Sequence, residues 1–431
     1  VIAEEPVLED PMEPHAEDVI PDEPDDPEED EDPGPLSDVV VLPAAATAGA
    51  QVRATCAALP LIAEQLADLR PRAVVILADG RAVHDAEVFA ALVGAQGPVP
   101  VIVRADLPLW VGALDVVIVL ECGTPTEAAG AAVARRRGAA VLVRGSARGP
   151  LAEAVPTALY PPPIGVPEAL AGPGRLAFLL MVASSLGMLK PGLTPEVVET
   201  VAALLDTEAL ACAPQTDAFV NPAVSLAQQW HSADLVLVGL DPVGQRLARH
   251  AAVTLAELGG ATASVFGALE MTRAAALMDR LSRRRDVFAD PYDDDPGADR
   301  LPVLPILLRV IRPADEMMAR SASAFLGSLQ RALPTAILLD GPELSLAPVA
   351  TGLPDQPTRV EPVGWVREWA SVALMMVRLD FTAVYVGIAE GQVPPLDVPA
   401  GLGAHDGARH LLEADTVVAT YRDEEDSDRW S

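Results

Sequence analysis

Short runs of β-branched and other aliphatic residues recur along the 431-residue chain and alternate with longer segments of helical composition. Such runs are typical of strands that are buried on both faces of a parallel sheet. The alternation predicts right-handed βαβ units with helices on both faces of each sheet. Two series of runs are present, which predicts an α/β fold with two doubly wound parallel sheets. The predicted strands are Ala73–Leu77, Val99–Val103, Asp115–Leu120 and Ala139–Val143 in the first series, and Asp234–Gly239, Ala263–Phe266, Val303–Leu308 and Ala336–Leu339 in the second.

A helical stretch without strand candidates separates the two series. Leu176–Leu189 is identified as the most apolar stretch, and it is shorter than the roughly 20 residues of a membrane span. We therefore expect it to be a buried helix, followed by another over Pro195–Leu205; a further helical segment, Ala44–Leu69, precedes the first strand. The predicted organisation is an acidic tail at 1–40, a first domain at 41–165, a helical connector at 166–220, a second domain at 221–400 and an acidic tail at 401–431.

The charge of the chain is strongly acidic, with 62 Asp and Glu against 30 Lys and Arg and a formal net charge of −32. Residues 1–38 hold 17 acids, eight prolines and no Lys or Arg. A segment of this composition cannot bury enough apolar surface to offset the entropy of ordering it, so it is predicted to be disordered. An acidic surface repels phosphate groups, so neither nucleic acid nor a membrane is expected as a partner.

The cysteines and the first residues indicate the cellular compartment in which the protein is expected. Cys56, Cys122 and Cys212 are far apart in the chain and form no C-x-x-C pair, so neither a disulfide framework nor a cysteine zinc site is indicated. The first residues are acidic, whereas a signal peptide begins with a positive region. A cytoplasmic location is expected.

Motifs for cofactors and metals are missing from the sequence. No G-x-G-x-x-G follows a predicted strand, and Gly239–Gly244 is followed by Gln245, where a P-loop requires lysine. The six histidines have no metal-ligand spacing, and each is interpreted as a surface or loop histidine. No metal or cofactor is expected.

Several segments occur in the order found in a known family. They are Ala48–Arg53, Pro71–Val75, Trp110–Asp115, Asn221–Ala223 and Ser225–Ala227. Over about residues 44–400 the chain resembles actinobacterial SIS-domain proteins, the bifunctional phosphoglucose/phosphomannose isomerases. The resemblance implies two sugar-isomerase (SIS) domains with parallel sheets, a homodimer with sites near domain and subunit boundaries, and a sugar phosphate or sugar derivative as ligand.

The phosphate-binding loops of that family are altered here. The first, a Gly-Gly-Ser turn, matches Asp79–Ala82, in which only Gly80 is retained and Arg81 follows it. In the second, Glu121–Glu127, Thr126 and Glu127 match, but Glu121 replaces a serine, and its charge would repel a phosphate by several kcal/mol unless Arg81 compensated. The substrate-binding residues implied by the resemblance are Gly80, Arg81, Glu121, Gly123, Thr124, Thr126 and Arg175.

The catalytic residues of the family are also partly replaced. The resemblance makes Glu257 the base that moves a proton between C1 and C2. The ring-opening histidine is replaced by Arg273, which stays protonated and cannot shuttle a proton; Glu270 lies three residues before it. Lys190 is the only lysine in the chain, and it does not match the family lysine. The structural alternatives are a surface glutamate for Glu257 and an N-terminal helix cap for Thr126.

Three functions follow as hypotheses. The first is a carbohydrate-derivative-binding SIS protein with a degenerate active site. The second is an active aldose–ketose isomerase that converts mannose 6-phosphate or glucose 6-phosphate to fructose 6-phosphate, with Glu257 as base and Glu270 or Arg273 in support. The third is a structural partner of another enzyme of sugar-nucleotide metabolism, with the acidic N-terminal tail as its docking segment.

Overall fold

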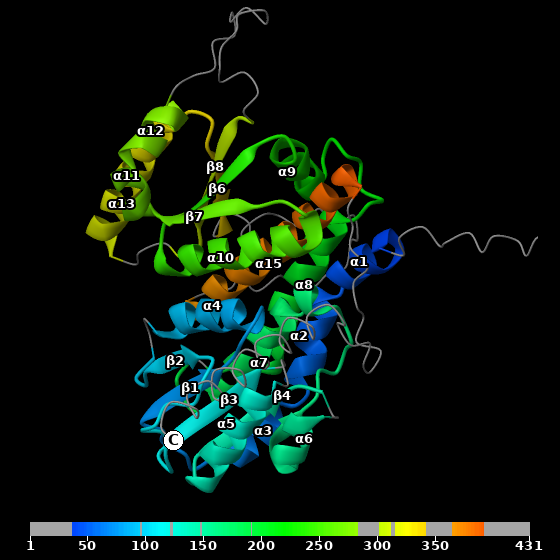
Figure 1. The fold of residues 1–431 in the computed structure, drawn as a ribbon, viewed down its shortest axis with the longest axis vertical. Helices are drawn as coiled ribbons and strands as arrows, with labels where there is room; N and C mark the ends of the chain where they lie inside the picture. Colours follow the sequence, from blue (N-terminus) through cyan, green and yellow to red (C-terminus); the bar gives the residue numbers. More distant parts are fainter. Residues whose placement is uncertain are drawn as a thin grey trace, which may run out of the picture.

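Two parallel sheets organise the computed structural model, which describes residues 37–94, 97–120, 124–146, 149–190, 192–282, 301–311, 315–341 and 364–391 (Figure 1). The first has the order β2-β1-β3-β4-β5 and the second the order β7-β6-β8-β9. The strands are β1 (Ala73–Leu77), β2 (Val101–Arg104), β3 (Asp115–Leu120), β4 (Ala140–Arg144), β5 (Leu159–Tyr160), β6 (Asp234–Gly239), β7 (Ala263–Gly267), β8 (Val303–Arg309) and β9 (Ile337–Asp340). All eight predicted strands are present within two residues of their expected bounds, and β5 was not expected.

The strand order reverses once in each sheet. In the first sheet β1 lies between β2 and β3, with Val75 beside Ile102 and Val117. In the second, β6 lies between β7 and β8, with Leu237 beside Val265 and Ile306. Ligands of open α/β sheets bind at such switch points, beyond the carboxyl ends of the strands. These points lie after β1 and β3, and after β6 and β8.

Helices cover both faces of each sheet, as predicted. One face of the first sheet packs on α5 and α6, and the outer face of the second packs on α11, α12 and α13. The inner faces of both sheets share one continuous core, in which α10 and α15 lie between the second sheet and α4 (Figure 1). The helices other than α15 are α1 (Ser37–Ala45), α2 (Ala48–Cys56), α3 (Leu59–Leu66), α4 (Ala82–Gly94), α5 (Pro125–Arg136), α6 (Pro150–Ala154), α7 (Gly172–Ser185), α8 (Pro195–Cys212), α9 (Pro222–Trp230), α10 (Pro242–Gly259), α11 (Ala268–Arg273), α12 (Ala275–Ser282) and α13 (Glu316–Ala332), with short 3₁₀ turns at Pro156–Ala158 and Glu168–Leu170.

Three of these helical segments differ in part from expectation, and one of them is the helix expected at Pro195–Leu205, which continues to Cys212 as α8. The stretch Ala44–Leu69 forms parts of three helices, α1, α2 and α3, and Pro60 stands at the start of α3, where a missing N–H costs no helical hydrogen bond. The predicted buried helix Leu176–Leu189 corresponds to the buried α7, which starts four residues earlier, at Gly172, and also ends four residues earlier, at Ser185.

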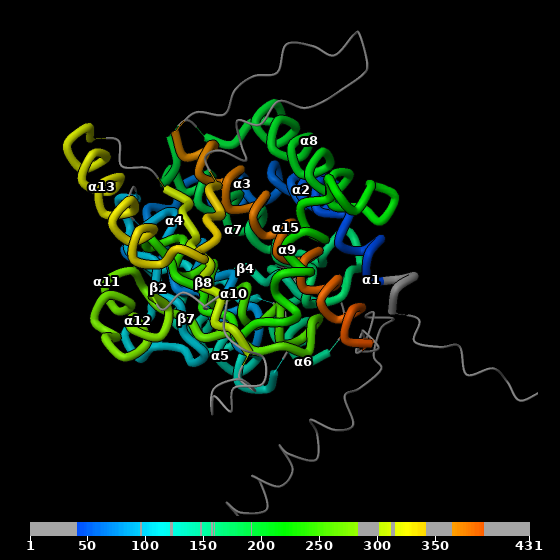
Figure 2. The backbone as a smooth tube through the Cα atoms, turned by 90° about the horizontal axis from the view of Figure 1, so that it is seen from above, coloured from blue at the N-terminus to red at the C-terminus, as the bar shows by residue number. Residues whose placement is uncertain are grey.

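The helix α15 (Trp365–Glu390) was not expected and is the longest in the part of the chain described here. It crosses the centre of the molecule (Figure 2) and packs on α10, α8 and α9. Among the described residues it is the one helix that is long and apolar enough to span a membrane by length and composition, so Leu176–Leu189 is not the most membrane-like segment. Because 78% of its most apolar stretch is buried within the protein, α15 is a core helix here.

Two glycines allow α15 to approach α10 closely. A Cβ added at Gly387 of α15 would lie 2.2 Å from the carbonyl oxygen of Leu258, and one at Gly259 of α10 would lie 3.0 Å from the carbonyl oxygen of Ala383. Real Cβ atoms do not approach backbone oxygens to 2.2 Å, so a side chain at Gly387 would separate the two helices.

We therefore predict that Gly387→Ala lowers the melting temperature, with an overpacking cost of about 1–3 kcal/mol. Gly327→Ala in α13 is the matched control, because the nearest atom to its Cβ, on Arg331, lies at 3.6 Å. That change should raise stability by up to about 1 kcal/mol through helix propensity. Calorimetric melting of both variants is the measurement, and a stabilised Gly387→Ala protein would show that the helices are not in close contact.

Candidate functional site

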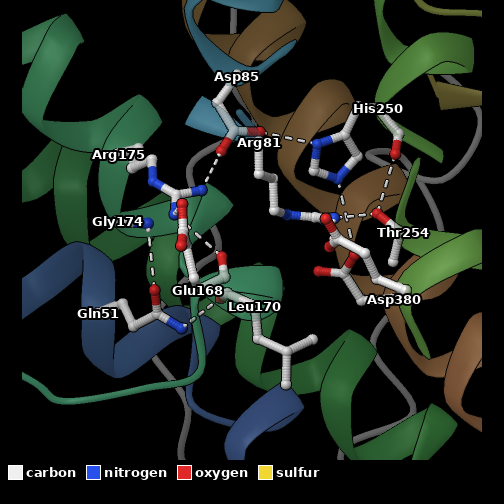
Figure 3. Close-up of polar contacts among 11 residues, drawn as sticks. Gln51, Arg81, Asp85, Glu168, Leu170, Gly174, Arg175, His250, Thr254 and Asp380 are labelled. Atoms are coloured by element: carbon white, nitrogen blue, oxygen red, sulfur yellow. Dashed lines mark hydrogen bonds and ion pairs between the residues drawn. The ribbon is translucent and has the colours of Figure 1, made fainter. Parts of the chain in front are cut away.

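The loop after β1 brings two of the predicted site residues into contact. Gly80 has a φ of +53°, a left-handed conformation that favours glycine. Arg81 follows it and is buried, with 3% of its side chain exposed. Its Nη1 donates to Oε2 of Glu257 at 2.6 Å. Its Nη2 donates to the hydroxyl of Thr254 at 2.5 Å (Figure 3). The expected base on α10 is therefore ion-paired to the first loop.

A buried ionic cluster lies next to this pair. Asp85, in the first turn of α4, accepts a hydrogen bond from Nη1 of Arg175 at 2.6 Å, and its Oδ1 lies 2.7 Å from Nδ1 of His250, at hydrogen-bond distance. His250 Nε2 lies 3.6 Å from Oδ1 of Asp380 on α15. The side chains of Asp85, Arg175, His250 and Asp380 point toward one another from four helices (Figure 3). We call these four residues the interhelix cluster.

Burial and charge act in opposite directions on the cluster. Burial alone would raise the pKa of Asp85, but the charges of His250 and Arg175 hold that pKa well below its ordinary value. Burial alone would lower the pKa of His250, but Asp85 and Asp380 raise it above its ordinary value. The pKa of Asp380 is raised, chiefly by burial. The cluster therefore stabilises a protonated His250 against an ionised Asp85.

The position of His250 corrects the sequence analysis, which interpreted it as a surface or loop histidine. It is 1% exposed and lies inside α10. Arg175, predicted to bind substrate, is also fully buried; its Nη2 donates to the carbonyl of Glu168 at 3.0 Å. Arg175 thus holds α7 to α4 in the protein interior.

The second predicted loop is described only in part, since Glu121 and Gly123 lie outside the described residues. Thr124 caps α5: its hydroxyl accepts from Glu127 N–H at 3.2 Å, and the Glu127 carboxylate accepts from Thr124 N–H at 3.1 Å. Thr126 is exposed in the first turn. The cap is therefore Thr124, and the alternative that assigned it to Thr126 is wrong.

Glu270 and Arg273 lie away from the Arg81–Glu257 pair. Both are on α11, where Glu270 accepts from Gly267 N–H at 2.7 Å and from Gln245 at 3.4 Å, and Arg273 is exposed. Gln245 and Glu257 are 12 residues apart on α10, which is about 18 Å along the helix. The structure therefore does not bring the three predicted catalytic residues together.

The second sheet has a carboxylate at its switch point. Oδ1 of Asp241 accepts from the N–H groups of Val243 and Gly244 at 3.0 and 2.9 Å, and Oδ2 accepts from those of Val310 and Ile311 at 2.7 and 3.1 Å. Burial raises the pKa of Asp241, while these four N–H groups favour its charged form. Two of these donors, those of Val243 and Gly244, lie at the N-terminus of α10, where backbone N–H groups can bind an anion. The carboxylate of Asp241 thus occupies the anion position at the N-terminus of α10.

A cavity of about 340 Å³ opens beside Asp241, between the ends of β6 and β8 and the helix α13. Its lining is mainly apolar, and the lining Arg309 is ion-paired to Asp340. Across the residues that the structure describes, no group of three or more His, Cys, Asp or Glu side chains is placed to hold a metal ion.

The comparisons with known proteins concern the fold. No protein-family model and no curated protein matches the sequence. Among solved structures, the C-terminal domain of glucosamine-fructose-6-phosphate aminotransferase from Francisella tularensis matches with a TM-score of 0.53 and 11% identity, over 81% of this chain and 96% of that one. Tagatose-6-phosphate ketose/aldose isomerase from Escherichia coli matches with a TM-score of 0.51 and 11% identity, over 84% and 96%. The predicted fold of two doubly wound parallel sheets, that of SIS phosphosugar isomerases, is confirmed.

Replacing Asp241 by alanine should destabilise the protein by more than an ordinary helix cap does. A lost cap costs about 0.5–2 kcal/mol, and each buried N–H left without an acceptor adds about 1–3 kcal/mol. Asp315→Ala is the matched control, since Asp315 caps α13 through one hydrogen bond, from Met318 N–H at 2.9 Å. Thermal unfolding compares the two variants, and equal losses would show that Asp241 contributes no more than a cap.

The raised pKa of His250 predicts a pH dependence of stability. A histidine whose pKa is higher in the folded state stabilises the fold below its unfolded pKa of about 6.5, and the contribution is lost as pH rises through the folded pKa. The decrease in melting temperature that His250→Gln causes, relative to the wild-type protein, should therefore be largest near pH 5–6 and should become smaller toward pH 8.

His84→Gln is the control with the opposite trend. Burial, together with the nearby His250, lowers the pKa of His84, so the contribution of His84 to stability should grow as pH rises through that range. Parallel pH trends in the two variants would contradict the assignment of a protonated His250.

Proposed function

We propose that this chain is a carbohydrate-derivative-binding SIS protein, related to the phosphoglucose/phosphomannose isomerases, whose active site is no longer catalytic. One observation carries the proposal: the carboxylate of Glu257 is held by Arg81, 2.6 Å away. A base that removes a proton from a sugar carbon must be within hydrogen-bond reach of that proton. Glu257 would first have to leave its ion pair with Arg81.

Other replacements support a loss of catalysis. An isomerase of this kind also needs a group that opens the sugar ring, and Arg273, at the position of the family histidine, cannot exchange a proton near neutral pH. It is exposed on α11, whereas Glu257 lies at the far end of α10. The single lysine, Lys190, is exposed near the end of α7. Neither Arg273 nor Lys190 is placed to act as the missing ring-opening acid beside Glu257.

Binding remains chemically possible at the first switch point. The buried Nε–H of Arg81 has no acceptor among the described residues, and an oxygen atom of a ligand would satisfy it. The carboxylate of Glu257 disfavours a phosphate in the same place. A neutral or cationic sugar derivative, bound by a cytoplasmic homodimer, is the ligand that this charge pattern favours.

A coupled assay tests the loss of catalysis. We predict that mannose 6-phosphate and glucose 6-phosphate are not converted to fructose 6-phosphate at ordinary enzyme rates of about 1–10³ per second. Turnover in that range that is abolished in Glu257→Gln and kept in Glu270→Gln would refute the proposal and favour the active isomerase.

A thermal-shift titration with glucose, glucosamine, glucose 6-phosphate and fructose 6-phosphate tests the binding. The uncharged or cationic sugars should raise the melting temperature more than the phosphates do, and Arg81→Gln should reduce that effect. A protein that responds to none of these compounds would contradict the proposed ligand class.

A further inference from the structure

The amino-terminal edge of the first sheet, opposite the switch point, carries an exposed apolar face. Leu109, Trp110 and Leu114, in the connection from β2 to β3, are 90%, 46% and 68% exposed. Exposed large apolar side chains that gather in one place mark interaction sites more often than isolated ones do. We call these three residues, with the neighbouring arginines Arg70, Arg72, Arg135, Arg136 and Arg137, the basic–aromatic face.

Hydrogen bonds to neighbouring elements fix the backbone of this face. Arg72 donates to both carboxylate oxygens of Asp115, at 3.1 and 2.8 Å, and to the carbonyl of Trp110 at 3.1 Å. Its guanidinium carbon lies 5.4 Å from the centre of the Trp110 ring. Arg137, at the end of α5, donates to the carbonyls of Pro108 and Leu109, both at 3.2 Å. The apolar side chains are thus presented outward on a preorganised frame, which lowers the entropy cost of binding.

The charge of this edge is opposite to that of the whole chain. The described segments that precede β1 to β4, residues 67–72, 97–100, 109–115 and 134–139, contain five arginines and two aspartates, a net charge of +3. One of the aspartates, Asp115, is buried and ion-paired to Arg72. The chain as a whole has a net charge of −32. A basic surface of this kind recognises acidic segments through charge-assisted hydrogen bonds.

The chain itself contains a complementary segment. Residues 1–36 hold 16 acids and no Lys or Arg, with the apolar pairs Val7–Leu8 and Val19–Ile20 among them. These 36 residues can extend over about 120 Å, more than twice the diameter of about 50 Å of a compact body of the size described here. Residues 401–431 are less suited, with eight acids and three arginines.

We propose that the acidic segment 1–36 docks on the basic–aromatic face of the same chain, with its carboxylates toward the arginines and its aliphatic residues against Leu109, Trp110 and Leu114. The contact covers an apolar face that would otherwise stay in water. It is held chiefly by charge, so salt weakens it. It lies at the edge of the sheet away from Arg81 and Glu257, and it does not depend on the ligand that they bind.

Acrylamide quenching of Trp110 in the full chain tests the proposal, with the Trp110 signal taken as the difference between the wild-type protein and Trp110→Phe. We expect the quenching constant of Trp110 to rise at least twofold from low to high salt. In Arg135→Glu/Arg136→Glu it should already be high at low salt. Arg320→Glu/Arg331→Glu, with the same charge change on α13, is the matched control and should behave as the wild type does.

A second variant of the full chain, in which the nine acids from Asp22 to Asp32 are changed to their amides, tests which segment covers the face. In this variant Trp110 should already be exposed to acrylamide at low salt. Trp110 that is quenched equally at low and high salt in the wild-type protein would overturn the proposal. Protection that survives the amide changes would assign the face to another segment and also overturn it. Protection that appears only as the protein concentration is raised would assign the face to a second copy, with the same consequence.

Discussion

The carboxylate of Asp85 joins the two halves of the molecule. It lies at the start of α4, beside the first sheet, and accepts hydrogen bonds from Arg175 of α7 and His250 of α10. The imidazole of His250 extends the contact to Asp380 of α15. Removing one partner of a buried ion pair typically costs about 3–5 kcal/mol, because the remaining charge stays desolvated. The packing of α10 and α15 between the sheets therefore depends on charges that neutralise one another.

The same principle governs both switch points, where the chain supplies the charges that a ligand would bring to an open site. After β1, Arg81 is neutralised by Glu257. After β6, four backbone N–H groups, two of them at the N-terminus of α10, donate to Asp241. A phosphate at either position would have to displace a carboxylate or lie against one, at several kcal/mol. At both switch points, the charged and polar groups are thus already paired within the chain.

The strands were predictable from sequence because their signal is local: a run such as Ala73–Leu77 identifies itself by its own β-branched residues. The interhelix cluster was not predictable from the sequence, because Asp85 and His250 are 165 residues apart and only the tertiary fold brings them together. The sequence did contain a sign that His250 is buried. It follows Leu247 by three residues and precedes Thr254 by four, a spacing that places all three on the same, buried face of α10. The apolar run Trp365–Glu390 likewise predicts a buried helix, α15. It was overlooked because Leu176–Leu189 was identified as the most apolar stretch of the chain. Arg81 and Glu257 were identified through the resemblance, but their contact with each other follows from the packing of α10 against α4.

The central claim is that Arg81 and Glu257 bind each other in the folded protein. A double-mutant cycle tests it directly, with Arg81→Gln, Glu257→Gln and the double variant compared by chemical unfolding at low ionic strength. If the two side chains form the ion pair, the double variant should lose less stability than the sum of the single variants, with a coupling energy of about 0.5–3 kcal/mol for groups in contact. Strictly additive losses would show that Glu257 is free of Arg81 and available as a base, and would contradict the account.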